Sequence, residues 1–351
     1  MPAPARFYAR DALGGGSDND TVRDCVDNIR RFGFCVLDHI IPPTKVAGVH
    51  DEVVEATPRI RAAQNLAAPG EMHNQVLFLP KYQQYLSHQL VVSVARAMLD
   101  THVRIAQTHI RHVSPDSTAT KDGGCFGGDA GRSTRGWHTD WPHDLSTYAQ
   151  GDDNAGAFPQ PFPNLTAALS MVWNLTPVGP ESAGTWIVPG SHLDLRNPRG
   201  PADGINVMAP IRGEMQIEAP AGSVLIQDTR CWHCQALHNP SGRARIAVVT
   251  RWAPWWLSVK DFGTDFGYTV NRMSRQQWES LPPPLQPLYR HLAKGVKDRM
   301  QPLNQLKSHA ALHRQQAGFA DPDGHSNAHI VVTVPTPVEV AAGHIAPVPR
   351  L

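Results

Sequence analysis

Two polar residues in a strand-like stretch could together bind a metal ion. His138 and Asp140 stand two positions apart in Gly-Trp-His-Thr-Asp. Because side chains two apart on an extended strand point to the same side, an imidazole nitrogen and a carboxylate oxygen would face one point. A His-x-Asp pair by itself is also common as a surface or hydrogen-bonded pair, so a metal site needs a further ligand.

His233 is the candidate for that further ligand. It follows the apolar run Val224-Leu225-Ile226 and a turn. A jelly roll can return a distant strand beside the first, which would place His233 next to His138 and Asp140. Two His and one carboxylate on one face of a metal form the facial triad of non-haem Fe(II) oxygenases, which leaves positions open for a co-substrate and dioxygen.

An arginine downstream could bind an anionic co-substrate. Arg243 and Arg245 enter a strand-like run after Asn239-Pro-Ser-Gly. A guanidinium that points into a barrel is costly unless it meets a carboxylate, and its planar fork suits one. The two arginines share the same parity on the strand, so spacing alone leaves both open.

The surrounding pattern predicts mainly β structure with flanking helices and a double-stranded β-helix, or jelly-roll, core. Short strand-like runs separated by Gly- and Pro-rich turns fill residues 161–258. Helical spacing and turn signals elsewhere predict the remaining elements: helices at 21–32, 44–63, 85–99, 274–281 and 287–297, and strands at 34–37 and 103–113.

These elements predict one domain over residues 1–316, with the jelly-roll core at about 103–256. Residues 317–351, rich in Pro, Gly and His, are expected to form a partly disordered tail. Residues 117–136 are rich in Gly and have no apolar period, which favours a loop that closes over a substrate.

At this point the chain resembles the phytanoyl-CoA dioxygenase (PhyH-like) family of Fe(II)/2-oxoglutarate-dependent oxygenases, over about residues 21–256. The resemblance rests on four motifs taken together: Arg31-Phe-Gly-Phe-Cys-Val-Leu37, the His138-x-Asp140 pair, the Gly184-x-x-x-x-Pro-Gly-Ser-His192 turn, and the run from Gly222 through His233 to Asn239 and Arg245.

The resemblance implies that His138, Asp140 and His233 bind Fe(II), and that 2-oxoglutarate and dioxygen are co-substrates. In the family the arginine follows the asparagine by six residues, which selects Arg245 over Arg243 for the distal carboxylate. Trp173 stands where a family tryptophan lines the 2-oxoglutarate pocket. The implied reaction is hydroxylation or another oxidation of a C–H bond, with release of succinate and CO2.

Several rival interpretations use the same residues. Iron halogenases lack the carboxylate that Asp140 provides, so halogenation is not expected. His192 could replace His233 as a ligand, but the family's Pro-Gly-Ser-His turn is structural. Cys231 and Cys234 could form a redox or zinc pair, although two reduced thiols are expected. A zinc hydrolase with the same triad, or a non-catalytic metal-binding jelly roll, are the alternative functions.

The amino-acid composition argues against some classes of binding partner. The 32 Lys and Arg residues nearly balance 31 Asp and Glu, giving a net charge of +1, without the excess that a nucleic-acid binder needs. No apolar run approaches the roughly 20 residues that span a bilayer, and no secretory h-region is seen, so a cytoplasmic protein is expected. The expected partner is a small or medium organic substrate; the oligomeric state, a homo-oligomer included, is left open.

Overall fold

The computed structural model describes residues 6–8, 18–66, 75–115, 136–144, 158, 160–199, 204–236, 239–257 and 273–296. All of these belong to one compact unit, Met1–Asp298. The proposed lid at 117–136, apart from Gly136, and the proposed tail at 317–351 lie outside the described residues. Among the described helices, none has the length and apolar character needed to cross a membrane.

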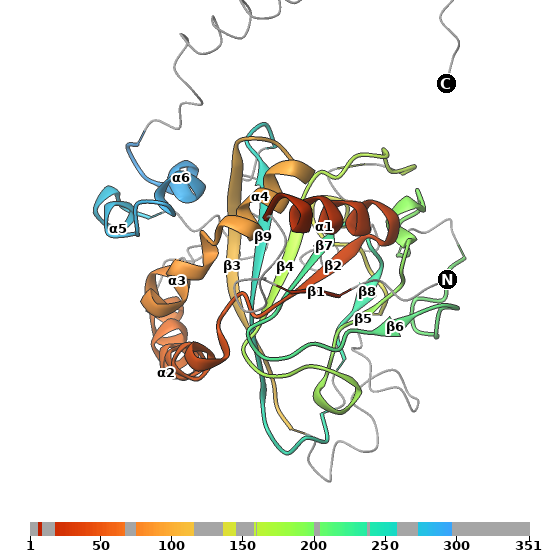
Figure 1. The fold of residues 1–351 in the computed structure, drawn as a ribbon, viewed down its shortest axis with the longest axis horizontal. Coiled ribbons are helices and arrows are strands. Elements are labelled where there is room, and N and C mark those ends of the chain that lie inside the picture. Colours follow the sequence, from red (N-terminus) through yellow and green to blue (C-terminus); the bar gives the residue numbers. More distant parts are fainter. Residues whose placement is uncertain are drawn as a thin grey trace, which may run out of the picture. The chain divides into compact units, whose positions relative to one another are not determined.

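The larger of two sheets has six strands (Figure 1). In spatial order these are β1 (Arg6–Tyr8), β2 (Phe34–Asp38), β7 (Val224–Asp228), β4 (Leu169–Asn174), β9 (Arg245–Pro254) and β3 (Val103–Val113). All neighbouring pairs are antiparallel except β1 and β2. Neighbouring strands such as β4 and β9 are far apart in the sequence, as a jelly roll requires.

The smaller sheet pairs β6 (Met215–Gln216), β5 (Trp186–Ile187) and β8 (His233–Cys234), with β5 in the middle. An apolar layer lies between the two sheets. In this layer, Val172 and Val249 of the larger sheet pack in one apolar cluster with Ile187 of the smaller sheet. The two sheets and the core between them confirm the predicted mainly β, jelly-roll class.

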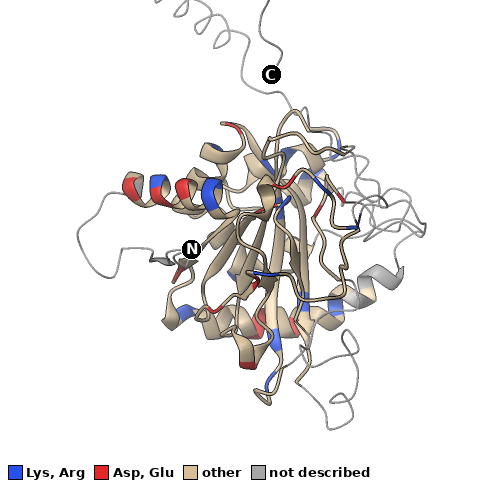
Figure 2. Cartoon of the chain, turned by 90° about the vertical axis from the view of Figure 1, so that its right-hand side faces the viewer, with Lys and Arg blue, Asp and Glu red and all other residues tan. Residues whose placement is uncertain are grey.

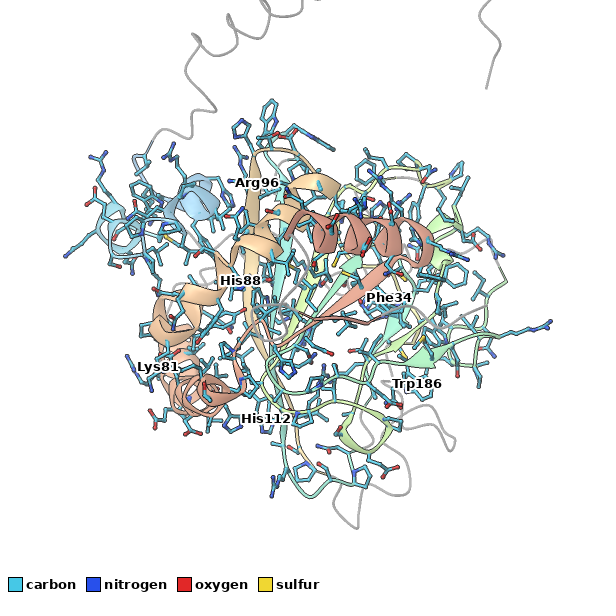
Figure 3. All side chains as sticks on the ribbon, in the orientation of Figure 1. Phe34, Lys81, His88, Arg96, His112 and Trp186 are labelled. Carbon is cyan, nitrogen blue, oxygen red and sulfur yellow. The ribbon has the colours of Figure 1, made fainter. Side chains whose placement is uncertain are left out.

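Helices cover the opposite face of the larger sheet (Figures 1 and 3). They are α1 (Asp18–Phe32), α2 (Pro43–Leu66), α3 (Pro80–Leu86) and α4 (Gln89–Met98). Acidic and basic residues occur along α1 and α2, whereas α3 and α4 contain one basic residue each and no acidic residue (Figure 2). Their inner surfaces bury apolar residues such as Ile29, Val53 and Val91 against Trp173 and Val248 of the sheet.

The C-terminal described segment contains α5 (Arg275–Glu279) and α6 (Gln286–Tyr289), followed by a short 3-10 helix, Arg290–Leu292. Two of the predicted helices differ from the structure. The helix expected at 85–99 is two helices, because the backbone of His88 is extended. The helix expected at 287–297 ends early, because Ala293 adopts an extended conformation.

Candidate metal centre and co-substrate pocket

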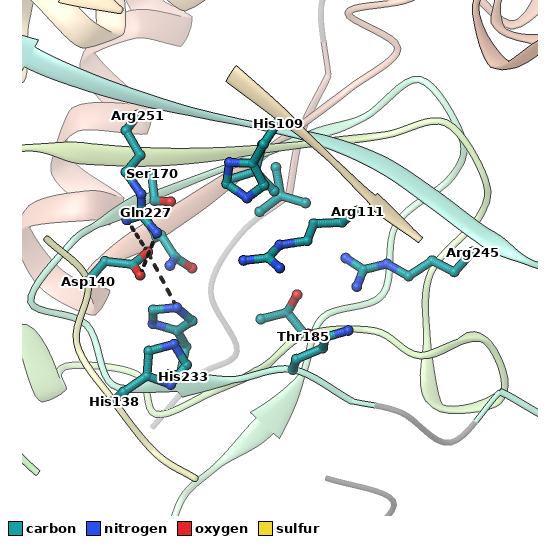
Figure 4. Close-up of a pocket in the computed structure, with 13 residues that line it drawn as sticks. His109, Arg111, His138, Asp140, Ser170, Thr185, Gln227, His233, Arg245 and Arg251 are labelled. Atoms are coloured by element: carbon teal, nitrogen blue, oxygen red, sulfur yellow. Dashed lines mark hydrogen bonds and ion pairs between the residues drawn. The ribbon is translucent and has the colours of Figure 1, made fainter. Parts of the chain in front are cut away.

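The three predicted ligands meet at one point. One nitrogen or carboxylate oxygen from each of His138, Asp140 and His233 lies within 4.8 Å of the others, and all three residues are buried. The imidazole rings of the two histidines are 4.3 Å apart, centroid to centroid. Nε2 of His233 lies 3.5 Å from Oδ2 of Asp140 (Figure 4). No other such cluster occurs in the described part of the chain.

Backbone hydrogen bonds bring these segments together. The amide of His138 donates to the carbonyl of His233 at 3.1 Å, and the amide of His233 donates back at 3.0 Å. The amide of Asp140 donates to the carbonyl of Thr229 at 2.7 Å. Residues 138–140 are therefore tied to β8 and to the turn that precedes it, which fixes the spacing of the ligands independently of any ion.

Each histidine is held with a defined ring nitrogen facing the site. Nδ1 of His138 lies 2.9 Å from the carbonyl oxygen of Gly136, and Nδ1 of His233 lies 2.9 Å from that of Cys231. Because a carbonyl can only accept, both Nδ1 atoms carry the proton. Each Nε2 then offers a lone pair, the arrangement found in metal-binding histidines. Two imidazole nitrogens and a carboxylate form a donor set that fits a divalent transition metal such as Fe(II).

Arg251 holds the carboxylate of Asp140. Its Nη2 donates to Oδ1 at 2.8 Å, and its Nη1 lies 2.7 Å from Oδ2. Burial by itself would raise the pKa of Asp140, but the charge of Arg251 and its hydrogen bond hold that pKa well below its usual range. Asp140 is thus a carboxylate in the buried site.

The site lies at one end of a pocket on the inner face of the larger sheet (Figure 4). Strand alternation explains the lining, because residues two apart on each strand face the pocket. The lining side chains of the larger sheet are His109, Arg111, Ser170, Val172, Gln227, Arg245, Val249 and Arg251. The pocket is therefore polar and rich in guanidinium groups.

Arg245 occupies this pocket together with Arg111 (Figure 4). Its side chain is buried, and its Nε has no hydrogen-bond partner among the described residues. Burial, and then the positive charge of Arg111, lower the pKa of Arg245 to about 10. Arg243 is exposed and precedes β9, so of the two arginines that spacing left open, the fold places Arg245 in the pocket.

The match between this chain and a protein-family model identifies the family to which the chain belongs. The model described as phytanoyl-CoA dioxygenase (PhyH) matches residues 29–247, more than half of the chain and all three candidate ligands. The chain belongs to the PhyH family. It is accordingly an Fe(II)- and 2-oxoglutarate-dependent oxygenase, which confirms the sequence-based expectation of fold, cofactor and general function.

This PhyH-family chain is also similar to individual proteins, with which it shares low sequence identity. Uncharacterized proteins from Mycobacterium bovis and Mycobacterium tuberculosis are each 23% identical to it over 239 residues, which cover 66% of this chain and 75% of theirs. The solved epimerase SnoN, in complex with Fe3+, alpha ketoglutarate and nogalamycin RO, is 16% identical, with coverage of 67% and 84% and a TM-score of 0.46. The non-heme alpha ketoglutarate dependent carbocyclase SnoK is 18% identical, with coverage of 69% and 87% and a TM-score of 0.46.

Trp173, predicted to line the 2-oxoglutarate pocket, is not among the residues that line this pocket of the PhyH-family chain. Its indole is fully buried on the helix-covered face of the larger sheet. It packs edge-on against Tyr82, and Nε1 donates to Oγ1 of Thr250 at 3.1 Å. The physical reason is the period of two in a strand: Val172 faces the pocket, so its neighbour Trp173 faces away.

The residues considered as alternative metal or redox groups, His192, Cys231 and Cys234, lie in buried structural positions of this PhyH-family chain. Nε2 of His192 lies 3.0 Å from the backbone carbonyl of Arg30, so this histidine joins its turn to α1. Cys231 and Cys234 are both buried, and neither is in a disulfide bond. Burial is the main cause that raises the pKa of Cys231 to about 12, which disfavours the thiolate needed for redox or zinc chemistry.

The sequence reasoning missed most of the residues that line the pocket, among them the polar or charged side chains of Arg251, His109, Arg111 and Gln227. Arg251 has the same parity as Arg245 on β9, and His109 and Arg111 alternate on β3, so strand periodicity was the available signal. Gln227 had no comparable signal, because the run Val224–Asp228 carries no predicted site residue whose parity could be extended to it.

Ser191 connects the Pro-Gly-Ser-His turn to the strand that carries His233. Its Oγ accepts from the amide of Trp232 at 2.7 Å and donates to the carbonyl of Val188 at 2.7 Å. We expect Ser191→Ala to lower the free energy of unfolding by about 1–3 kcal/mol, because a buried amide loses its partner. Urea unfolding measures this, with the exposed Ser280→Ala as control, expected within about 0.5 kcal/mol of the wild type. Equal losses in both variants would contradict the assigned role.

Proposed function

We propose that this PhyH-family oxygenase hydroxylates a C–H bond of a small or medium organic molecule, with iron held by His138, Asp140 and His233 and the distal carboxylate of 2-oxoglutarate bound by Arg245. The observation that carries the proposal is the pocket itself. Two Nε2 lone pairs and a carboxylate converge at one end, and the buried guanidinium of Arg245, from the larger sheet, lines the same pocket.

Bound iron would supply the redox chemistry, in which dioxygen and 2-oxoglutarate yield succinate, CO2 and an oxidised substrate. The residues of the chain bind, orient and exclude water. The Gly136 and Cys231 carbonyls fix the two imidazole rings, and Arg251 fixes the plane of Asp140. Arg245 supplies a planar pair of donors that suits a carboxylate.

The guanidinium groups separate this proposal from a zinc hydrolase or a non-catalytic metal-binding protein. Either alternative could use the same His and Asp ligands. Neither has a use for Arg245, whose buried charge lowers stability in the absence of an anion. The arrangement of Arg245 and Arg111 in one pocket is explained by an anionic co-substrate.

Anaerobic absorption spectroscopy tests the proposal. Adding Fe(II) and 2-oxoglutarate to the metal-free protein should produce the visible iron-to-2-oxoglutarate charge-transfer band. His138→Ala should remove this band, because one of the two imidazole ligands is lost. Substrates can then be screened by succinate release, and label from 18O2 in the product identifies hydroxylation. Absence of a band in the wild type, with retention of zinc and no response to 2-oxoglutarate, would contradict the proposal.

A further inference from the structure

Three polar side chains form a row on the inner face of the larger sheet, at the metal end of the pocket. Gln227 of β7 stands opposite Ser170 of β4, and Ser170 stands opposite Arg251 of β9. Residues opposite one another on neighbouring strands project to the same face, and all three side chains line the pocket. Arg251 pairs with Asp140, and Figure 4 shows Gln227 and Ser170 at this end of the pocket, away from Arg245. The row therefore lies beside a candidate metal ligand.

Gln227 and Ser170 are polar residues in an otherwise apolar part of the sheet. Two positions along the same strands stand Leu225 and Val172, which belong to the apolar layer between the sheets. Gln227 and Ser170 are each only 2% exposed, and Oε1 of Gln227 is buried with no hydrogen-bond partner among the described residues. A buried polar atom without a partner lowers stability, so it requires an explanation outside the fold. A ligand that pairs with Oε1 in the pocket provides one.

The chemistry of Gln227 and Ser170 defines what that ligand must offer. The Oε1 atom of Gln227 is a carbonyl oxygen, which only accepts, so its partner must donate an O–H or N–H. The 2-oxoglutarate dianion and dioxygen carry no such donor, so neither of them can be that partner. The hydroxyl of Ser170 can donate and accept. A ligand hydroxyl can therefore donate to Gln227 and accept from Ser170 at the same time.

The charge of the pocket favours a neutral donor over a cationic one. The described lining residues include the guanidinium groups of Arg111, Arg245 and Arg251, and Asp140 is the acidic residue among them. A bound metal dication and a 2-oxoglutarate dianion cancel one another and leave this positive balance unchanged. An ammonium group would be repelled, and in a buried site such repulsion is screened far less than in water. A neutral hydroxyl meets no such repulsion.

We propose that Gln227 and Ser170 bind a hydroxyl group of the substrate beside the metal centre, so that Gln227 is a specificity-determining residue and the substrate is an alcohol or a polyol. This deepens the proposed function and rests on it. A hydroxyl held at this place would orient the substrate so that a C–H bond near the hydroxyl faces the metal. A glutamine that served only the fold would contribute to stability and not to the choice of ligand.

Thermal unfolding of the ligand-free protein separates a binding role from a structural one. Gln227→Met keeps the side-chain length and removes a polar atom that has no partner, so its melting temperature should equal or exceed that of the wild type. The matched control is Gln83→Met, because Gln83 is also buried but its Nε2 donates to the carbonyl of Val76 at 2.9 Å. This control should melt about 2–4 °C below the wild type. An equal loss in both variants, or a Gln227→Met protein that does not fold, would assign Gln227 to the fold and overturn the proposal.

Ligand-observed saturation-transfer NMR tests the recognition itself without turnover. The protein is loaded with Zn(II) and 2-oxoglutarate and titrated with benzyl alcohol and cyclohexanol, each compared with the methyl ether and the primary amine of the same carbon skeleton. In the wild type each alcohol should bind about tenfold more tightly than its ether, which lacks the donor, and more tightly than its amine. Gln227→Met should bring the ratio of ether to alcohol Kd to within about twofold of one, whereas Gln83→Met should keep the wild-type ratio.

The 2-oxoglutarate signal in the same spectra separates failure of this inference from failure of the proposed function. If 2-oxoglutarate does not bind to the metal-loaded wild type, the proposed function is wrong and this inference falls with it. If 2-oxoglutarate binds but the alcohols do not bind, or bind no better than their ethers, only the hydroxyl assignment is wrong. The same conclusion follows if the preference survives in Gln227→Met. Tighter binding of the amines would indicate a cationic substrate and would also overturn the assignment.

Discussion

Replacing His233 with alanine is expected to weaken Mn(II) and Fe(II) binding by more than about a hundredfold and to abolish 2-oxoglutarate turnover. Loss of a residue that merely supports a metal ligand costs roughly 10–100-fold in affinity, and His233 is proposed as a ligand itself. Its Nε2 lies 3.5 Å from Oδ2 of Asp140, and its backbone is paired with that of His138. The backbone pairing survives the substitution, so the protein should still fold. Mn(II) titration measures the affinity, and succinate release measures turnover.

His192→Asn is the matched control for this prediction. His192 is also a buried histidine and was the rival ligand in the sequence, but its ring contacts the backbone carbonyl of Arg30. We expect this variant to keep the Mn(II) affinity of the wild type and to lose about 1 kcal/mol of stability, since one hydrogen bond changes. Loss of metal binding in His192→Asn but not in His233→Ala would show that the proposed ligand set is wrong.

Replacing Arg245 with methionine is expected to raise the KM for 2-oxoglutarate by about a hundredfold or more. Truncating one partner of a buried charge pair costs roughly 2–5 kcal/mol, and Arg245 is proposed to pair with the distal carboxylate. The same substitution should not lower the melting temperature of the protein without ligand. Arg245 is buried beside Arg111, with a pKa lowered to about 10, so its charge opposes folding until an anion binds. Methionine keeps the apolar volume without that charge.

Steady-state succinate release as a function of 2-oxoglutarate, together with thermal melting, measures both effects. The matched control is Arg243→Met, two residues earlier and exposed, which should change neither the KM nor the melting temperature. A fall in melting temperature of Arg245→Met with an unchanged KM would mean that Arg245 serves the fold and does not bind the co-substrate.

Local sequence patterns predicted most of the elements that carry these groups. The apolar spacing in α1 and the alternating run in β3 gave elements at nearly their observed bounds. The small-residue and Pro-rich turns between 161 and 258 predicted short strands. Helix ends were less accurate: a break at His88 divides one predicted helix, because capping depends on backbone conformation that apolar spacing does not encode.

The sequence by itself predicted that His138 and Asp140 share a side, because the period of two on an extended segment is a local property; in the structure His138 forms a single β-bridge to His233 and no strand covers residues 138–140. It also determined the donor types that suit Fe(II). Only the tertiary structure decided which side of each strand faces the pocket and which strands are neighbours. That choice brought His233 to His138, placed Arg245 in the pocket and Arg251 on Asp140, and turned Trp173 away into the helix-covered core. The reason is that strand pairing between distant segments is fixed by burial of the whole sheet, and not by the residues next to each ligand.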